Sequence, residues 1–108
     1  MATFDDYEKE LGKGVRKLAQ KLVDGFEEEA LSDMNTFIGK SGKDLKRWTG
    51  MLEAGEITGE DFRDLLEAQK ALASLHELTL VGIGHTKLER FRTDLTQLLV
   101  DTAMKVYL

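Results

Sequence analysis

Residues 55–62 read Gly-Glu-Ile-Thr-Gly-Glu-Asp-Phe, a glycine followed by a threonine that stands three positions before an aspartate. Glycine often terminates a helix, because it adopts the left-handed backbone conformation without steric cost. A Ser or Thr followed three positions later by an acidic residue forms a capping box, in which each side chain accepts a hydrogen bond from the other residue's backbone N–H. This stretch therefore predicts that one helix ends near Ala54 and that another begins after Thr58.

The same pairing recurs along the chain. Capping boxes are expected at Thr3 with Asp6, Ser41 with Asp44, Thr58 with Asp61 and Thr86 with Glu89. Glycines stand before the helices that the last three boxes would start: Gly39 and Gly42, then Gly55, then Gly82 and Gly84. Four starts predict four helices, over residues 4–38, 43–54, 59–81 and 87–107. The alternative is that residues 59–108 form a single helix with a kink at Gly82–Gly84.

A fifth pair of this kind, Ser74 with Glu77, is not counted as a start. No glycine precedes it, and it lies inside a run of apolar residues at helical spacing. Before Thr58, Ile57 is placed to pack against Phe62 as a hydrophobic staple, which would fix how the chain enters the helix over 59–81.

The first predicted helix carries one apolar stripe along its whole length. Its apolar residues recur every three or four positions: Tyr7, Leu11, Val15, Leu18, Leu22, Phe26, Ala30, Met34 and Phe37. This is the period of an amphipathic helix that buries one face. The connections between the predicted helices are short, which favours antiparallel neighbours. We therefore expect residues 1–108 to be one all-α domain, a helical bundle with a long N-terminal helix, a central helical hairpin and a C-terminal helix.

Composition limits the class of protein. The chain has 108 residues, of which 42% are hydrophobic and 32% charged, and this proportion is typical of a globular domain. Its net charge of −5 disfavours nucleic-acid binding. There is no cysteine, so disulfides and thiolate chemistry are excluded. The sequence shows no transmembrane run and no signal-peptide pattern at its start, and we expect a small acidic protein of the cytoplasm.

Motifs that would carry chemistry fail at named positions. His76 and His85 lack the Glu-x-x-His and His-x-x-x-His partners of a helical metal site. We expect His76, on the apolar face of its helix, to be a core residue. Gly39-Lys40-Ser41 resembles the end of a phosphate-binding loop, but Met34 stands where that loop needs a glycine. The prediction is a protein without catalytic residues, cofactor or metal; the alternative is a helical bundle that binds a metal or cofactor through His76.

The predicted helix over residues 4–38 has basic residues in its first half and acidic residues in its second half. Lysines and Arg16 make the first half basic, and the segment from Asp24 to Asp33 is acidic. Two copies packed antiparallel would set each basic half against an acidic half, the self-complementary pattern of a two-fold interface. The sequence therefore predicts a homodimer. Its predicted interface residues are Leu11, Val15, Leu18, Leu22 and Phe26 of the first helix, and Leu95, Leu98 and Leu99 of the last.

Two short stretches resemble known families. Residues 52–62 are similar to the turn of short bacterial helical-hairpin modules of the SHOCT type, which implies an oligomerisation or attachment element. Trp48-Thr49-Gly50 resembles the Trp-x-Gly signature of small secreted helical hairpins of the WXG100 type. The function expected from the whole sequence is a non-enzymatic protein–protein interaction or assembly module that works as a homo-oligomer. The alternative in the same class is a small secreted or phage-type helical structural protein.

Overall fold

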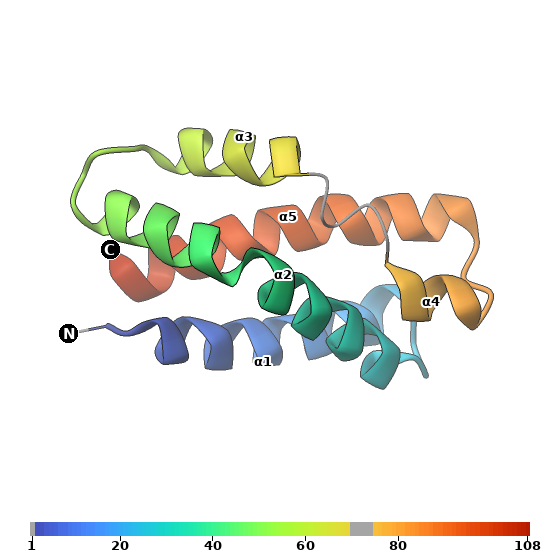
Figure 1. The fold of residues 1–108 in the computed structure, drawn as a ribbon. Coiled ribbons are helices and arrows are strands. Elements are labelled where there is room, and N and C mark those ends of the chain that lie inside the picture. Colours follow the sequence, from blue (N-terminus) through green and yellow to red (C-terminus); the bar gives the residue numbers. More distant parts are fainter. Residues whose placement is uncertain (1, 70–74) are drawn as a thin grey trace.

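The computed structural model describes residues 2–69 and 75–108, and all regular structure in these two ranges is helical. Helix α1 spans Phe4–Leu22, α2 Glu27–Glu53, α3 Gly59–Gln69, α4 His76–Leu80 and α5 His85–Tyr107. Figure 1 shows the two termini at the same end of an elongated bundle, so α1 and α5 run in opposite directions side by side. Helix α2 packs on α1, and α3 packs on α5. The prediction of an all-α bundle is confirmed.

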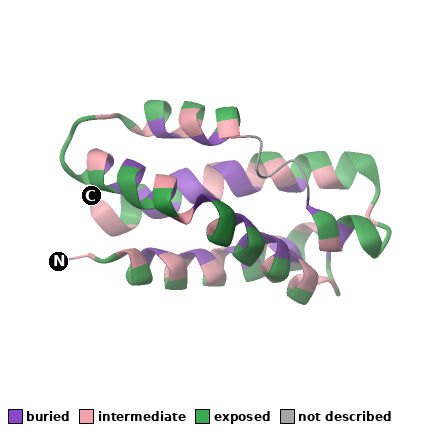
Figure 2. Cartoon of the chain, in the orientation of Figure 1, coloured by how far each residue is buried: buried purple, intermediate pink, exposed green. Residues whose placement is uncertain are grey.

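The core lies between the inner faces of these helices, as Figure 2 shows by the buried residues along them. Tyr7, Leu11, Val15 and Ala19 follow one another at four-residue spacing on α1, and each is completely buried. Phe91, Leu95, Leu99 and Ala103 do the same on α5. The Tyr7 hydroxyl donates a hydrogen bond to the Leu99 carbonyl oxygen at 2.8 Å, which ties the two helices together inside the core. Burial of its ring raises the pKa of Tyr7.

Two of the four predicted capping boxes are confirmed. At the start of α1, Thr3 N donates to Asp6 Oδ2 at 3.0 Å and Asp6 N donates to Thr3 Oγ1 at 3.2 Å. At the start of α3, the corresponding distances for Thr58 and Asp61 are 2.9 and 3.1 Å. The predicted break at Gly82 is also confirmed, because Gly82 has φ +87° and α5 begins three residues later. The alternative of one kinked helix over 59–108 is therefore wrong.

The long helix over 4–38 is wrong. Helix α1 ends at Leu22, and Gly25, with φ +93°, turns the chain back on itself. Folding back places Val23 and Ala30 in the core, with exposed fractions of 3% and 0%. The apolar stripe is real, but the bundle needs it as two antiparallel segments rather than one rod.

The predicted start at Ser41 and Asp44 is also wrong, because α2 continues through Gly39 and Gly42. A glycine inside a helix costs about 1 kcal/mol relative to alanine. Here the packing of α2 outweighs that cost, since its buried residues lie on both sides of the two glycines. Ser41 itself is buried in mid-helix, and Asp44 accepts a hydrogen bond from Gln69 of α3 at 2.8 Å.

The last predicted box, Thr86 with Glu89, does not start a helix. Helix α5 begins at His85, before Thr86, and its N-cap Gly84 has no side-chain hydrogen bond. The predicted helix over 59–81 appears as α3 and the separate five-residue α4, while residues 70–74, with Ser74 among them, lie outside the described residues. His76 is exposed at the first position of α4, so its prediction as a core residue is wrong.

Candidate functional site: the groove between α1 and α5

A groove runs between α1 and α5 on the outer side of their contact. It exists because the two helices approach closely at Gly14: a Cβ added there would lie 2.8 Å from Cδ1 of Leu98. Contacts this short do not occur, so any larger residue at position 14 would displace Leu98. The Leu98 side chain therefore covers the Gly14 backbone and forms the floor of the groove.

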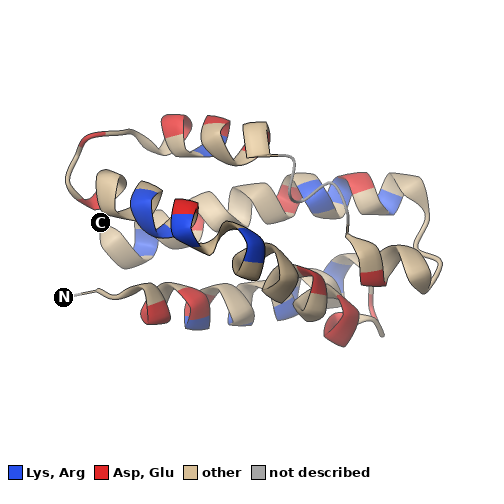
Figure 3. Ribbon diagram, in the orientation of Figure 1, with Lys and Arg blue, Asp and Glu red and all other residues tan. Residues whose placement is uncertain are grey.

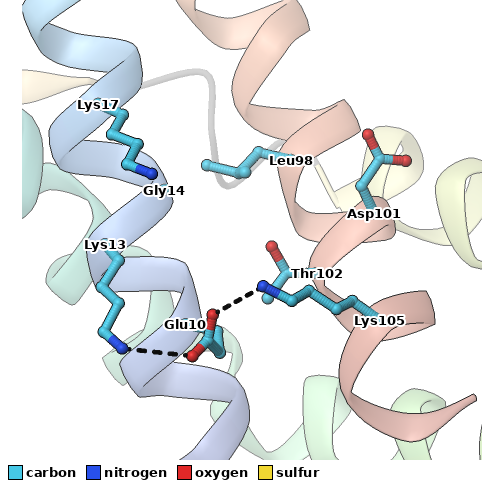
Figure 4. Close-up of a pocket in the computed structure, with 8 residues that line it drawn as sticks. All are labelled: Glu10, Lys13, Gly14, Lys17, Leu98, Asp101, Thr102 and Lys105. Carbon is cyan, nitrogen blue, oxygen red and sulfur yellow. Dashed lines mark hydrogen bonds and ion pairs between the residues drawn. The ribbon is translucent and has the colours of Figure 1, made fainter.

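The groove consists of two adjoining hollows that share Leu98 and Asp101. The larger one has a volume of about 480 Å³ (Figure 4). It is lined by residues of α1 and α5 alone: Glu10, Lys13, Gly14, Lys17, Leu98, Asp101, Thr102 and Lys105. The smaller hollow, of about 200 Å³, continues it towards Leu18 and Asp94. Polar groups from two different helices thus surround an apolar floor made by Leu18 and Leu98.

Glu10 organises the charges at one end of the groove. Its carboxylate forms ion pairs with Lys105 across the groove at 3.2 Å and with Lys13 on its own helix at 3.4 Å. The pKa of Glu10 is held below its ordinary value, first by the hydrogen bond from Lys105 and the charge of that lysine, then by Lys13. This end of the groove is therefore electrostatically satisfied within the chain.

Along the rest of the groove, the described charged side chains of α1 and α5 form no ion pair with each other. Lys17 on α1, which lines the groove, forms no ion pair with any residue that the structure describes. On the α5 side, Asp101 accepts a hydrogen bond from Gln97 at 2.8 Å, and its carboxylate points away from α1 in Figure 4. The α1 rim thus carries Lys17 without an acidic partner, and the α5 rim presents the Asp101 carboxylate outward.

The eight predicted interface residues divide into two groups. Leu11, Val15, Leu95 and Leu99 are completely buried inside this single chain, where α5 covers α1. They have no surface left for a second chain in this structure. The other four are half-buried against the core: Leu18, Leu22, Phe26 and Leu98. Of these, Leu18 and Leu98 border the groove.

The basic and acidic halves of residues 4–38 lie against each other within the same chain. Figure 3 shows the acidic start of α2 beside the second half of α1, where basic residues gather. One ion pair joins them, between Arg16 and Glu28 at 3.2 Å. Both side chains are more than half exposed, and such pairs contribute less than about 1 kcal/mol. The complementarity that predicted a contact between two chains therefore also guides the antiparallel packing of α1 and α2.

Asp33 has a role that the sequence did not reveal. It is only 7% exposed, and its two carboxylate oxygens accept hydrogen bonds from the backbone N–H groups of Glu77 and Leu78, at 2.8 and 3.1 Å. Asp33 of α2 therefore caps α4, although the two elements are more than forty residues apart. Nothing local marks it, because the sequence shows Asp33 only as one more carboxylate in an acidic segment.

One alternative function named from the sequence is a metal or cofactor site that uses His76. Among the described residues, no group of His, Asp and Glu side chains is placed to hold a metal ion. His76 and His85 are both exposed, each at the first residue of a helix. Within 2–69 and 75–108, no helix is long and apolar enough to cross a membrane.

No family model, no curated protein and no solved structure matches this chain. The Trp48-Thr49-Gly50 motif lies inside α2, and the chain turns only after Glu53. The turn after it does contain the stretch that resembles the SHOCT-type modules, with the Thr58–Asp61 box at its centre.

Proposed function

We propose that this protein is a non-enzymatic assembly module that forms a homodimer through the groove between α1 and α5. The observation that carries the proposal is the unequal charge of the two rims. Apart from the ion pairs of Glu10 with Lys13 and Lys105, the α1 rim presents Lys17. The α5 rim presents Asp101 and Asp94, and Asp94 lies 4.0 Å from Arg90 of its own helix. A surface with one basic and one acidic edge is complementary to a second copy of itself.

The positions of the charges on the two rims decide which two-fold symmetry fits. A two-fold axis parallel to the groove places α1 of one copy on α5 of the other. Lys17 and Asp101 line the same stretch of the groove, so this rotation brings Lys17 of each copy towards Asp101 of the other. A two-fold axis across the groove would instead set the lysines of one α1 against those of the other, which repel. The first arrangement is the one that the charges favour.

Leu18 and Leu98 supply the apolar centre of this contact. They are half-buried in the single chain, and a second copy would remove their remaining surface from water. Two leucines make a small apolar centre, so the charges contribute mainly specificity and the affinity is moderate. We expect a Kd on the order of 10 µM at low salt, weakening as the salt concentration rises.

Charge reversal tests the proposal directly. Lys17→Glu and Asp101→Lys should each weaken dimerisation at least about tenfold, and the double variant should regain most of the affinity, because the pair is restored with its signs exchanged. Sedimentation equilibrium at low and high salt measures the Kd values. Lys40→Glu is the matched control, since Lys40 is exposed on α2 and does not line the groove. A wild-type chain that is monomeric at high micromolar concentration, or a double variant no better than either single one, would overturn the proposal.

A further inference from the structure

The structure also points to a second way in which two copies can join. We propose that the site on α2 and α5 where α1 packs can be occupied by the α1 of another copy, with residues 23–26 as the hinge. The partner is then a second copy of this chain, joined by exchange of α1. This inference does not depend on the groove dimer, because it uses the inner face of α1 rather than its outer rim.

The first support is an apolar stripe that continues across the hinge without a change of phase. Leu18, Leu22, Phe26, Ala30 and Met34 follow one another at four-residue steps, although α1 ends at Leu22 and α2 begins at Glu27. A turn between two independent helices has no reason to keep this phase. A single straight helix over the two segments would place all five residues on one face.

The second support is that the N-cap residue of α2 provides no side-chain cap. Its N-cap Phe26 makes no side-chain hydrogen bond to the first turn, unlike Thr3 and Thr58 at the starts of α1 and α3. The Glu27 carboxylate instead accepts a hydrogen bond from the Gly25 N–H at 3.0 Å, within the hinge. Within the hinge, Gly25 has a left-handed backbone, at φ +93°. In a continuous helix Gly25 would take an ordinary helical conformation, so the open form removes this left-handed dihedral angle.

The third support is that exchange keeps the contacts of the closed chain. The Tyr7–Leu99 hydrogen bond and the Arg16–Glu28 ion pair would form between two copies with the same partners. The buried faces of α1, α2 and α5 would meet in the same way. The equilibrium therefore depends on the hinge and on protein concentration, which is the usual condition for domain swapping.

Substitution of Gly25 tests the hinge. A Cβ at position 25 meets no atom within 4 Å, so Gly25→Ala acts only through the backbone dihedral angle. It should destabilise the closed hinge and raise the dimerisation constant by on the order of 10²-fold, because two strained turns are relieved in each dimer. Gly55→Ala is the matched control: Gly55 has φ +77° and the same open space, but the Thr58–Asp61 box starts a new helix directly after it.

Cross-linking between different chains identifies the exchanged dimer. The natural chain has no cysteine, so Arg16→Cys can be placed on one chain and Glu28→Cys on another. The two are mixed, unfolded, refolded together and treated with a short bismaleimide. A product that contains one chain of each kind is expected with Gly25→Ala and not with Gly55→Ala, because exchange at the second turn would move α1 and α2 together. Lys17→Glu should leave this product unchanged, which separates it from the groove dimer.

The same mixture without Gly25→Ala covers the case in which that variant does not fold. There we expect a minor cross-linked product that grows with the protein concentration during refolding. The absence of a mixed product in both backgrounds would overturn the exchange. Equal dimerisation of the Gly25→Ala and Gly55→Ala variants would overturn the role of residues 23–26 as the hinge.

Discussion

Helices α3 and α4 begin in opposite ways. The first turn of α3 is capped by Thr58 and Asp61, which are three residues apart and satisfy each other's backbone N–H groups. The first turn of α4 has no side-chain cap from its own N-cap, Leu75, and is capped instead by Asp33 of α2. A helix start that is completed by its sequence neighbours can be predicted from the sequence, whereas one that is completed across the fold cannot.

The two helices also differ in how far they depend on the rest of the fold: α4 needs contacts with α2, whereas the start of α3 does not. Helix α4 has five residues, too few to be stable by its own hydrogen bonds. It is held by the burial of Leu75 and Leu78, which are 3% and 0% exposed, and by the two hydrogen bonds to Asp33. Helix α3 is longer, and its start needs no other element. Substitutions at the two caps should therefore differ in how much they destabilise the protein and in which helices they affect.

The largest effect is expected for Asp33→Ala. It removes both acceptors and leaves two N–H groups without partners, that of Leu78 buried and that of Glu77 partly buried. The free energy of unfolding should fall by about 2–3 kcal/mol. Urea unfolding measures the loss, and hydrogen exchange at those two amides should speed up more than exchange in α3. Asp33→Asn keeps one oxygen acceptor and should lose about half as much. A loss below about 0.5 kcal/mol would show that α4 does not depend on this cap.

A smaller and more local effect is expected for Thr58→Ala. Removal of an N-cap hydroxyl costs about 1 kcal/mol, and here the cost should be confined to the first turn of α3. Thr58→Ser keeps the hydroxyl and should be close to neutral. Hydrogen exchange should report faster opening near Asp61 and little change at Glu77. If Thr58→Ala opened α4 as strongly as Asp33→Ala, the contrast between a local and a distant cap would be wrong.

The same contrast explains how much of the fold the sequence could predict. The helical class, the boxes at Thr3 and Thr58 and the break at Gly82 depend on neighbours in the chain, and all were predicted. The turn at Gly25 was missed, because the apolar stripe reads through it and only packing against the rest of the bundle decides that the chain folds back. Gly42 was misread as a stop for the converse reason, since packing carries α2 through it.

The candidate site shows a similar limit. Leu18 and Leu98 were named from their helical spacing and do lie at the groove, but Leu11 and Leu99, chosen by the same rule, are core residues. Spacing identifies the apolar face of a helix and not which part of that face the same chain covers. Gly14 marks the close approach of α5, but the sequence does not distinguish it from Gly12, which has open space around it.

The finest form of the comparison uses two glycines of α1 that lie two residues apart. A Cβ at Gly12 meets no atom within 4 Å, whereas a Cβ at Gly14 meets Leu98 at 2.8 Å. Gly12→Ala should therefore raise the free energy of unfolding by about 0.5–1 kcal/mol through helix propensity alone. Gly14→Ala gains the same propensity but displaces Leu98, so its net effect should be near zero or negative. Thermal and urea unfolding measure the difference, and shifts of the Leu98 methyl resonances should appear only with Gly14→Ala. Equal stabilisation by both substitutions would show that Leu98 yields without cost, and the groove floor would then be softer than its geometry indicates.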